Sequence, residues 1–426
     1  MVRWRYRRKS APYQAHSVCW SEFLDQPATH IVKERIATLR CALLRRQQRG
    51  FRAETPMSRT QSAPVRFGVL RLADSAPAVV ALQRGMFREL GLAVEISVEP
   101  SWANIADKLA YGLLDAASML PPLALAAALG LRGPPSRLWV PMSLSAGGNA
   151  IVVSRAAADD MHVTSALPDA LAAGRRFGAW LRAQRSPPRF AVVHAFSTHN
   201  LLLRYWLAAS GLDPDRDISS VVIPPEAVER ALATGEIAGF CAGAPWGALA
   251  AERGSGQVLL GTSAIWRAHP EKCLAIAAPW AAANPDTVRA LLRGLLRAQH
   301  FCEEAGTRVA AMLAEPPLSL PCAASRASLP GGTVLEPIRF QAGYSYFPWR
   351  SQAAWFLVQL RRWGWLAADV DVRQAAQRVY RPELLAEAAA DEGLAVPGAD
   401  SKREGLGEPF CDGVIFDQNG QHENKT

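Results

Sequence analysis

The spacing of apolar residues changes near position 65, where a regular alternation of strand-like and helix-like patterns begins. Residues 65–72 and 92–100 have the short apolar runs that predict β-strands. Residues 74–90 and 101–118 instead repeat apolar positions every three to four residues, as amphipathic helices do. Strands that alternate with helices predict a mostly parallel sheet with helices on its faces.

A second set of alternating elements begins near residue 166. Residues 166–184 and 195–215 are predicted helices, and a strand is predicted to begin at residue 189. From residue 285 onward the pattern is mainly helical. We therefore predict an α/β fold of two lobes with a ligand cleft between them and a helical C-terminal third.

The predicted boundaries divide the chain into four parts. These are a basic extension at 1–64, lobe 1 at 65–155 plus 270–397, lobe 2 at 156–269, and a polar tail at 398–426. We expect the extension to lie outside the fold, because it is rich in Arg and Gln and lacks strand alternation. The tail is expected to be polar and rich in glycine, with one short final strand.

The net charge of +9 is concentrated at the start of the chain. Residues 1–56 hold twelve Lys or Arg and four Asp or Glu, so this segment carries 12 − 4 = +8. The other 370 residues therefore carry only 9 − 8 = +1. A near-neutral body gives no argument for direct nucleic-acid binding, despite the high isoelectric point.

The basic start is not followed by the apolar segment of about 7–15 residues that a signal peptide requires. Arg7 and Arg8 form a twin-arginine pair, but no apolar segment follows them either. Met57 stands just before the first predicted strand and would be a natural start of translation. We therefore expect a cytoplasmic protein, or a periplasmic one if the start is misassigned or export takes another route. The sequence contains no run of about 18 apolar residues, so no transmembrane segment is predicted.

The sequence lacks the common catalytic signatures. The G-x-S-x-G, P-loop, H-E-x-x-H and G-x-G-x-x-G motifs do not occur, and the eight histidines have no metal-ligand spacing. The seven cysteines contain no C-x-x-C pair, which favours buried free thiols in a reducing compartment. These patterns predict a binding protein rather than an enzyme, with no cofactor and no bound metal.

Two predicted helices begin with unusual hydrogen-bond donors. Trp102 follows the capping residue Ser101, and His199 and Asn200 follow the dipeptide 197–198. The first N–H groups of a helix lack partners and the helix dipole is positive there, so anions bind at such ends. Core packing for Trp102 and a solvated cap for His199 are the simpler interpretations. Both residues stand at strand-to-helix junctions, where α/β clefts place ligands, and this favours anion binding.

Two further segments add candidate donors. Gly148 and Asn149 lie in the sequence SAGGNA, where glycine allows backbone N–H groups to approach a ligand closely. Lys272 closes the sequence HPEK just before an apolar strand and would bring a positive charge to the cleft. An ordinary turn and a surface turn are the alternative interpretations of these two segments.

Seven segments in order, from about residue 65 to about 397, together resemble the nitrate/bicarbonate-binding protein family of ABC transporters. They are LADSAPAVVALQRGMF, SWANIADKLAYGLLDAASMLPPLALAAALG, GGNAIVVS, HNLLLRYWLAASGLDPDRD, GFCAGAPW, HPEKCLAI and FPWRSQAAWFLVQLRRWG. The resemblance implies a type II periplasmic-binding-protein fold, in which two α/β lobes close on a small anion.

The resemblance also implies which residues bind the anion. In the family these are the tryptophan of the first helix start, the histidine of the second, the GGNA loop and a residue of the HPE segment. The matching positions in this chain are Trp102, Gly148, Asn149, His199 and Lys272. Nitrate receptors of the family have lysine at the last position and bicarbonate receptors have an acid, so the implied ligand is nitrate, or nitrite.

One position departs from the family pattern, and two cellular roles are open. Ala244 stands where the family often has the acid of GEPW. Family members serve as receptors for an ABC transporter permease and ATPase, or as cytoplasmic sensors that hold an RNA-binding antiterminator inactive until the anion binds. We expect the sensor role, because no export signal is predicted. A bicarbonate or alkanesulfonate receptor and a pyrimidine-precursor synthase-like enzyme are the alternatives.

Overall fold

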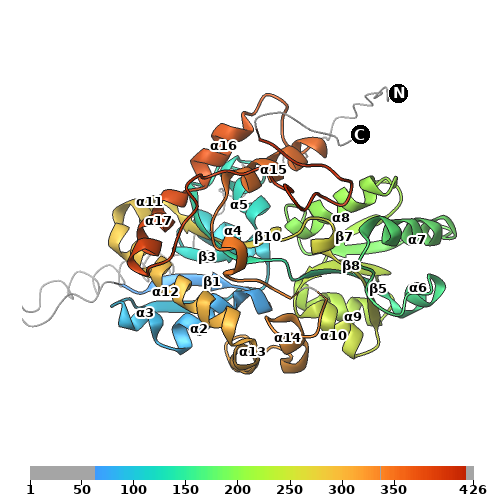
Figure 1. The fold of residues 1–426 in the computed structure, drawn as a ribbon, viewed down its shortest axis with the longest axis horizontal. Helices are drawn as coiled ribbons and strands as arrows, with labels where there is room; N and C mark the ends of the chain where they lie inside the picture. The colour runs from blue at the N-terminus through green and yellow to red at the C-terminus, as the bar shows by residue number, and fades with distance from the viewer. Residues whose placement is uncertain (1–62, 336, 419–426) are drawn as a thin grey trace, which may run out of the picture. The chain divides into compact units, whose positions relative to one another are not determined.

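The computed structural model describes residues 63–335 and 337–418 (Figure 1). All but the last two positions of the predicted basic extension lie outside these described residues, so the predictions for that segment stay predictions. Among the described residues, the strands form two five-stranded sheets. Each sheet, together with its helices, makes one of the two lobes expected from the sequence.

In the sheet of lobe 1, four strands run in the same direction and one, β10, runs opposite to them. Its strands are, in spatial order, β2 (Val94–Val98), β1 (Val65–Val69), β3 (Ala116–Met119), β10 (Pro270–Ala277) and β4 (Leu138–Ala146). β1 is parallel to β2 and β3, whereas β10 is antiparallel to β3 and β4. β10 is far from the others in sequence, because it brings the chain back from lobe 2.

The sheet of lobe 2 repeats this arrangement. Its strands are, in spatial order, β7 (Ser219–Val222), β6 (Arg189–Val192), β8 (Gly239–Gly243), β5 (Asn149–Ser154) and β9 (Gly256–Gly261). β6 is parallel to β7 and β8, and β5 is antiparallel to β8 and β9. In each sheet, therefore, the antiparallel strand beside the parallel set is the one that enters from the other lobe.

The chain passes from lobe 1 to lobe 2 at residues 147–148, between β4 and β5. This crossing lies before the boundary expected at residue 155, so β5 belongs to lobe 2 and not to lobe 1. Residues 149–154 form a strand, as predicted, but the apolar sequence of a strand does not indicate which sheet it joins. The chain returns through the short helix η4 (Thr262–Ala264) before β10.

Helices cover both sheets and fill the C-terminal third. Those of lobe 1 are α2 (Ala76–Gln83), α3 (Met86–Glu89), α4 (Trp102–Ala110), α5 (Pro121–Ala128), α11 (Ala278–Ala283) and α12 (Pro285–Glu304). Those of lobe 2 are α6 (Arg155–Asp160), α7 (Ala170–Arg182), α8 (Thr198–Ala209), α9 (Val228–Ala233) and α10 (Trp246–Glu252). The remaining ones are α13 (Gly306–Ala314), α14 (Cys322–Ser328), α15 (Arg350–Arg362), α16 (Val372–Val379) and α17 (Pro382–Asp391).

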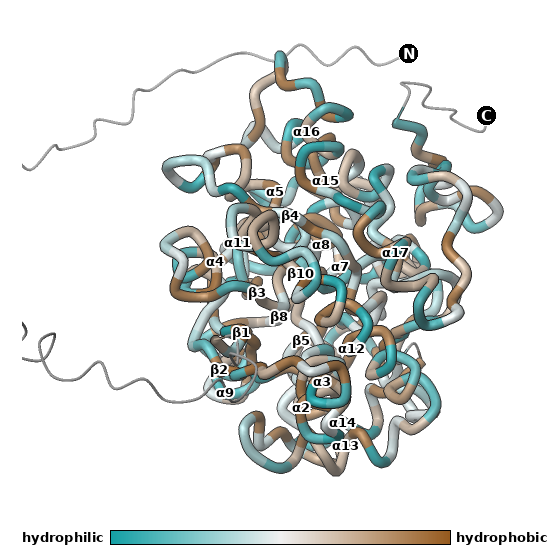
Figure 2. Tube along the Cα trace, turned by 90° about the vertical axis from the view of Figure 1, so that its left-hand side faces the viewer, coloured by the Kyte–Doolittle hydropathy of each residue, from teal (hydrophilic) through white to brown (hydrophobic). Residues whose placement is uncertain are grey.

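The longest of these helices, α12, shows why the amphipathic patterns form helices here. Pro285 occupies its first turn, where the missing N–H is not needed, and Leu291 and Leu295 are fully buried. The helix packs its apolar side against α2 and α17. Figure 2 shows the same mixture of hydrophobic and hydrophilic stretches along most helices, as expected where only one face packs inward.

Residues 398–418, here called the C-terminal strap, do not form the polar tail predicted from the sequence. Phe410 is 2% exposed and Phe416 is 4% exposed, and Glu404 is buried as well. The expected final strand is reduced to one antiparallel bridge, in which the backbones of Glu404 and Phe416 exchange two hydrogen bonds of 2.9 Å. The segment is polar and rich in glycine on average, but a few apolar residues such as Phe410 and Phe416, here called its anchors, pack onto the fold.

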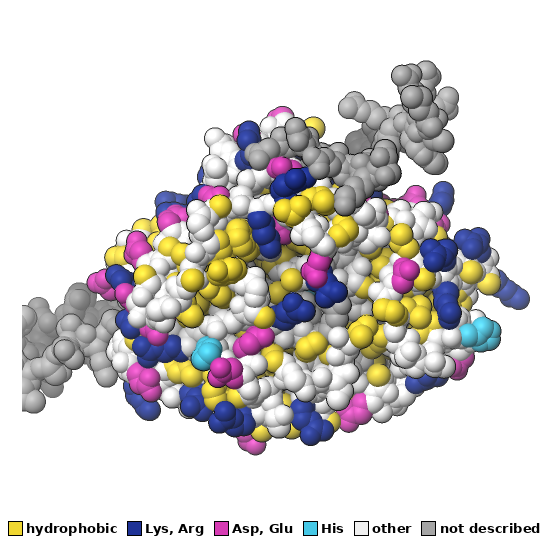
Figure 3. Space-filling model, in the orientation of Figure 1, with side chains coloured by type: hydrophobic (Ala, Val, Ile, Leu, Met, Phe, Trp, Pro, Cys, Tyr) yellow, Lys and Arg dark blue, Asp and Glu magenta, His cyan; other side chains and the backbone are white. Residues whose placement is uncertain are grey.

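The surface agrees with the nearly neutral charge of the chain after residue 56. Figure 3 shows Lys or Arg side chains interspersed with Asp or Glu over the visible face. Among the described residues, no helix combines the length and the apolar character needed to cross a bilayer.

Candidate functional site

The topology brings several strand ends to one place between the lobes. The short helix η2 (Ala73–Ser75) follows β1, α4 follows β2, and α8 follows β6. The antiparallel strands β5 and β10 begin at the same edges, because they run opposite to their neighbours. Carboxyl ends of parallel strands are where α/β folds bind ligands, so this junction is the first candidate for a site.

The two helix starts singled out in the sequence have the predicted caps. Ser101 Oγ accepts a hydrogen bond from the Asn104 N–H at 3.2 Å, and Ser197 Oγ accepts one from the Asn200 N–H at 3.0 Å. His199 is fully buried at the start of α8. The interpretation of His199 as polar fill at a solvated helix end is therefore wrong.

Lys272 is the centre of a buried ionic cluster. Its Nζ lies 2.8 Å from Asp74 Oδ2 and 2.5 Å from Glu271 Oε1. The same ammonium lies 5.3 Å from the centre of the Trp102 ring. All four side chains are at most 2% exposed. Lobe 1 thus supplies one cation, two carboxylates and an indole to the junction.

Lobe 2 meets this cluster through His199 and Asn149. His199 Nε2 lies 3.1 Å from Glu271 Oε1, and the Asn149 amide donates a 2.5 Å hydrogen bond to Glu271 Oε2. Gly243, at the end of β8, faces the same place, since a Cβ there would lie 3.4 Å from both His199 Nε2 and Asn149 Oδ1. Trp102, Asn149, His199 and Lys272 therefore share one cluster, as the sequence analysis required of them.

Gly148 is the predicted site residue whose Cα does not face this cluster. Its φ of +80° is a left-handed conformation, and a Cβ added there would lie 2.4 Å from Ile338 Cγ1. Its carbonyl accepts a hydrogen bond from the Ala244 N–H at 3.1 Å. Gly148 shapes the crossing between the lobes, and only its neighbour Asn149 reaches the ionic cluster with its side chain.

Glu271 and Asp74 are site residues that the sequence analysis did not predict. Side chains of adjacent strand residues normally point to opposite faces, so Lys272 at the site should turn Glu271 away. The pairing of β10 with β4 shifts register on both sides of Lys272, and this irregularity brings both side chains into the cluster. The signal for Asp74 was its place directly after the first strand, at a helix start.

Burial and charge set the protonation of the cluster. Burial raises the pKa of Glu271 to about 7, against the opposing effect of Lys272. It also raises the pKa of Asp74, again opposed by Lys272. Burial would lower the pKa of Lys272, but its two carboxylate partners outweigh that effect and raise it. The pKa of His199 is well below its ordinary value because of burial and the Lys272 charge, so this imidazole is neutral.

Several buried polar atoms around the cluster have no hydrogen-bond partner among the described residues. They include Trp102 Nε1, Ser145 Oγ, Thr198 Oγ1 and His199 Nδ1. A buried donor without a partner costs about 1–3 kcal/mol, so folds keep such groups where a ligand pairs with them. Ser145 is the strand partner of Lys272 in the pairing of β4 with β10. A small polar ligand with several acceptors suits this set.

The lobes also contact one another next to the cluster. The Ala73 N–H donates a 2.9 Å hydrogen bond to the Ala244 carbonyl of the other lobe, and Arg71 forms a 3.3 Å ion pair with Glu226. Ala244 thus joins the lobes through its backbone, and this bond does not depend on the acid that the family often has there. Its side chain, with that of Asn149, lines a neighbouring cavity of about 550 Å³.

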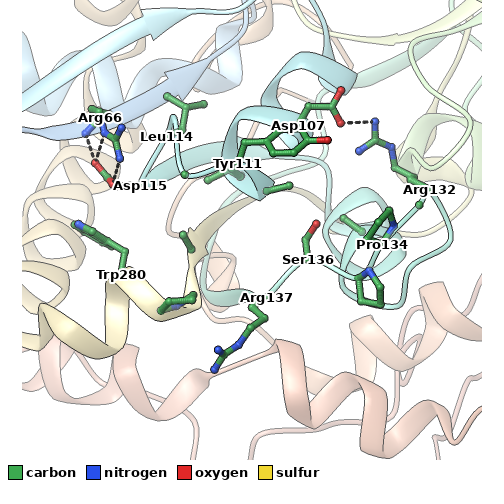
Figure 4. Close-up of a pocket in the computed structure, with 18 residues that line it drawn as sticks. Arg66, Asp107, Tyr111, Leu114, Asp115, Arg132, Pro134, Ser136, Arg137 and Trp280 are labelled. Atoms are coloured by element: carbon green, nitrogen blue, oxygen red, sulfur yellow. Dashed lines mark hydrogen bonds and ion pairs between the residues drawn. The ribbon is translucent and has the colours of Figure 1, made fainter. Parts of the chain in front are cut away.

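A separate cavity of about 630 Å³ lies on lobe 1 (Figure 4). Arg66 and Asp115 form one ion pair at its wall, and Arg132 and Asp107 form another. None of the predicted site residues lines it. It lies at the amino ends of β1 and β3, whereas sheets of this kind bind ligands at the carboxyl ends. Among the described residues, no group of three or more His, Cys, Asp or Glu could hold a metal ion.

Comparison with known proteins identifies the family of this chain. The NMT1-like family matches residues 58–314. The nitrate/nitrite binding protein NrtA of Synechococcus elongatus is 31% identical over 388 residues, covering 83% of this chain and 83% of that protein. The nitrate import ATP-binding protein NrtC of Synechocystis is 33% identical over 373 residues. That match covers 83% of this chain, but the chain spans only about half (53%) of NrtC.

The structural comparison agrees with the sequence comparison. The crystal structure of the periplasmic nitrate-binding protein NrtA from Synechocystis superposes with a TM-score of 0.75 at 26% identity, covering 84% of this chain and 96% of that one. The predicted periplasmic-binding-protein fold and the predicted family resemblance are therefore confirmed. The chain belongs to the NMT1-like family and is a homologue of the nitrate/nitrite-binding protein NrtA.

Proposed function

We propose that this protein binds a small monovalent oxyanion, with nitrate as the preferred ligand and nitrite as a close second. The observation that carries the proposal is the cluster of Trp102, Asn149, His199 and Lys272 between the two lobes. These residues combine one ammonium group with two ring nitrogens, Trp102 Nε1 and His199 Nδ1, that have no hydrogen-bond partner among the described residues. Homologues named for nitrate and nitrite binding support the same ligand class.

Lys272 is the residue that favours nitrate. An ammonium group ~4 Å from an anion contributes about 4 kcal/mol at an effective dielectric constant of ~20, before desolvation. Nitrate presents three acceptor oxygens, and the indole N–H of Trp102 can only donate. The pairing of a cation with such donors therefore selects an anion that carries acceptors alone.

Bicarbonate is the alternative ligand, because an acid, Glu271, adjoins the lysine. A bicarbonate hydroxyl can donate a hydrogen bond to a carboxylate, which nitrate cannot do. Glu271 would be the acceptor, since its Oε1 lies within 3.1 Å of His199 and 2.5 Å of Lys272. Titration calorimetry with nitrate, nitrite, bicarbonate and an alkanesulfonate distinguishes these ligands. Tightest binding of bicarbonate or of the alkanesulfonate would contradict the assignment to nitrate.

Replacing the buried histidine is expected to weaken nitrate binding substantially. His199→Ala removes a donor of the cluster, and a hydrogen bond to a charged group contributes about 1.5–3 kcal/mol. The dissociation constant measured by calorimetry should rise roughly 10- to 100-fold. His300→Ala is the matched control, because His300 is exposed on α12 and pairs with Glu304 and Gln341 rather than with the cluster. An equal effect of both substitutions would exclude His199 from the site.

We further propose that the protein is a cytoplasmic nitrate sensor, with the transporter receptor as the second role. The buried free thiols of Cys241, Cys273 and Cys302 are compatible with a reducing compartment. In the sensor role, closure of the lobes on the anion would change the surface offered to an RNA-binding antiterminator. Cell fractionation, together with capture of an antiterminator that nitrate releases, tests this role. A periplasmic location would refute it and favour a permease and ATPase as partners.

A further inference from the structure

We propose that Glu271 makes anion capture a proton-coupled step, in which each nitrate bound above neutral pH brings one proton into the cluster. The inference rests on the proposed function, since it concerns how the same site accepts its ligand. In this proposal Glu271 sets the charge of the cluster and the hydrogen-bonding groups that the ligand meets. Neither the donors at the two helix starts nor Lys272 has this role.

The positive charge of Lys272 is already neutralised within the protein. Its Nζ is shared between Asp74 Oδ2 at 2.8 Å and Glu271 Oε1 at 2.5 Å. With both carboxylates ionised and His199 neutral, the formal charge of the four groups is 1 − 2 = −1. A second anion placed in this buried cluster would be repelled unless one negative charge were removed.

Hydrogen bonding leads to the same requirement. Nitrate and an ionised carboxylate both present only acceptors, so they repel one another at contact distance. A proton taken up by Glu271, whose Oε1 lies 3.1 Å from His199 Nε2, turns this carboxyl group into a hydrogen-bond donor. The step is balanced: the protein takes up one nitrate and one proton, the cluster stays at −1, and no covalent bond between heavy atoms changes.

Other titratable groups surround Glu271 on every side. They are Asp74 on η2, His199 on α8, Cys241 on β8, His269 just before β10, and Lys272 and Cys273 on β10. Burial raises the pKa of both thiols, so neither ionises near neutral pH. His269 Nε2 lies 2.8 Å from Thr262 Oγ1, and burial lowers its pKa to about 4.

Glu271 changes its protonation near neutral pH, while Asp74, whose pKa burial also raises, stays paired with Lys272 at 2.8 Å. The raised pKa of Glu271, about 7, means that it is already protonated at pH 6 and largely ionised at pH 8. A bound anion adds negative charge and raises that pKa further. Below pH 7 nitrate should bind without proton uptake. Above pH 7 one proton should enter per nitrate, and the affinity should fall up to tenfold for each pH unit.

Proton uptake can be measured directly by adding potassium nitrate to the whole protein in unbuffered solution and titrating back the pH. This avoids sulfonate and phosphate buffers, which could compete for an oxyanion site. We expect close to one proton per bound nitrate at pH 8.5 and close to none at pH 6. Calorimetric affinities should fall by up to roughly 30-fold between pH 6 and pH 8.5.

Glu271→Gln supplies a permanent donor of the same shape, so the variant should take up no proton and bind nitrate with the same affinity at both pH values. Glu404→Gln is the matched control: Glu404 is equally buried, with a pKa also raised to about 7, but it pairs with Ser351 and Lys402 in the C-terminal strap. That variant should keep the proton uptake of the parent.

The outcomes separate this inference from the proposed function. Nitrate binding without proton uptake at pH 8.5, or unchanged uptake in Glu271→Gln, would overturn the role of Glu271 and leave nitrate binding intact. Absence of nitrate binding by the parent at every pH from 6 to 9 would refute the proposed function and this inference together. If proton uptake were lost in Glu404→Gln but kept in Glu271→Gln, Glu404 and not Glu271 would be the group that takes up the proton.

Discussion

Nitrate binding is expected to be lost when Lys272 is replaced by glutamate. The change removes an attraction of about 4 kcal/mol at ~4 Å and adds a repulsion of comparable size. In the parent, the ammonium is the partner of Asp74 and Glu271, so Lys272→Glu would leave three carboxyl groups together without a cation. We expect the dissociation constant for nitrate in calorimetry to rise by roughly 1000-fold or more.

A graded series separates charge from folding in this experiment. Lys272→Gln removes the cation without adding an anion, so its loss of affinity should lie between those of the parent and Lys272→Glu. Circular dichroism and thermal unfolding of each variant show whether the two lobes are still folded. If Lys272→Glu is folded and binds nitrate as tightly as the parent, the assignment of the ligand to this cluster is wrong.

The parts of the site that could be predicted from sequence are those with a local signature. Trp102 and His199 follow capping residues at helix starts, and backbone geometry there depends on a few neighbouring positions. Glu271 could not be predicted, because its orientation depends on a register shift between strands that are far apart in sequence. Its presence changes the chemistry of the site, since it neutralises the charge that Lys272 brings.

The fold shows the same division between local and long-range information. The helices and strands follow the apolar spacing, because burial of one face needs no knowledge of the partner. The assignment of β5 to lobe 2 depends on pairing with β8 and β9, which lie about 90 to 110 residues later. The C-terminal strap was missed for a related reason: three or four apolar anchors among polar residues produce no periodic pattern.

Phe410 joins the strap to lobe 2 and to the helical third. The Phe410 ring stacks on Trp355 of α15, with centroids 5.6 Å apart, and lies 5.1 Å from Trp266 and 5.5 Å from Tyr205 of α8. Asp412 accepts a hydrogen bond from the Tyr205 hydroxyl at 2.8 Å. Aromatic pairs of this kind contribute about 0.5–1.5 kcal/mol beyond the area that they bury.

The substitution Phe410→Ala is therefore expected to destabilise the protein strongly, although the residue lies in a segment of polar composition. Deleting a buried phenylalanine side chain costs about 3–5 kcal/mol, which for a chain of this size lowers the midpoint of thermal unfolding by about 5 °C. Leu406→Ala on the same strap is the matched control, because Leu406 is 64% exposed and should change the midpoint by less than about 1 °C. Scanning calorimetry of both variants tests the difference. Equal midpoints would mean that the strap is not part of the folded core in solution, whereas a drop confined to Phe410→Ala would show that its aromatic contacts with α8 and α15 stabilise the fold.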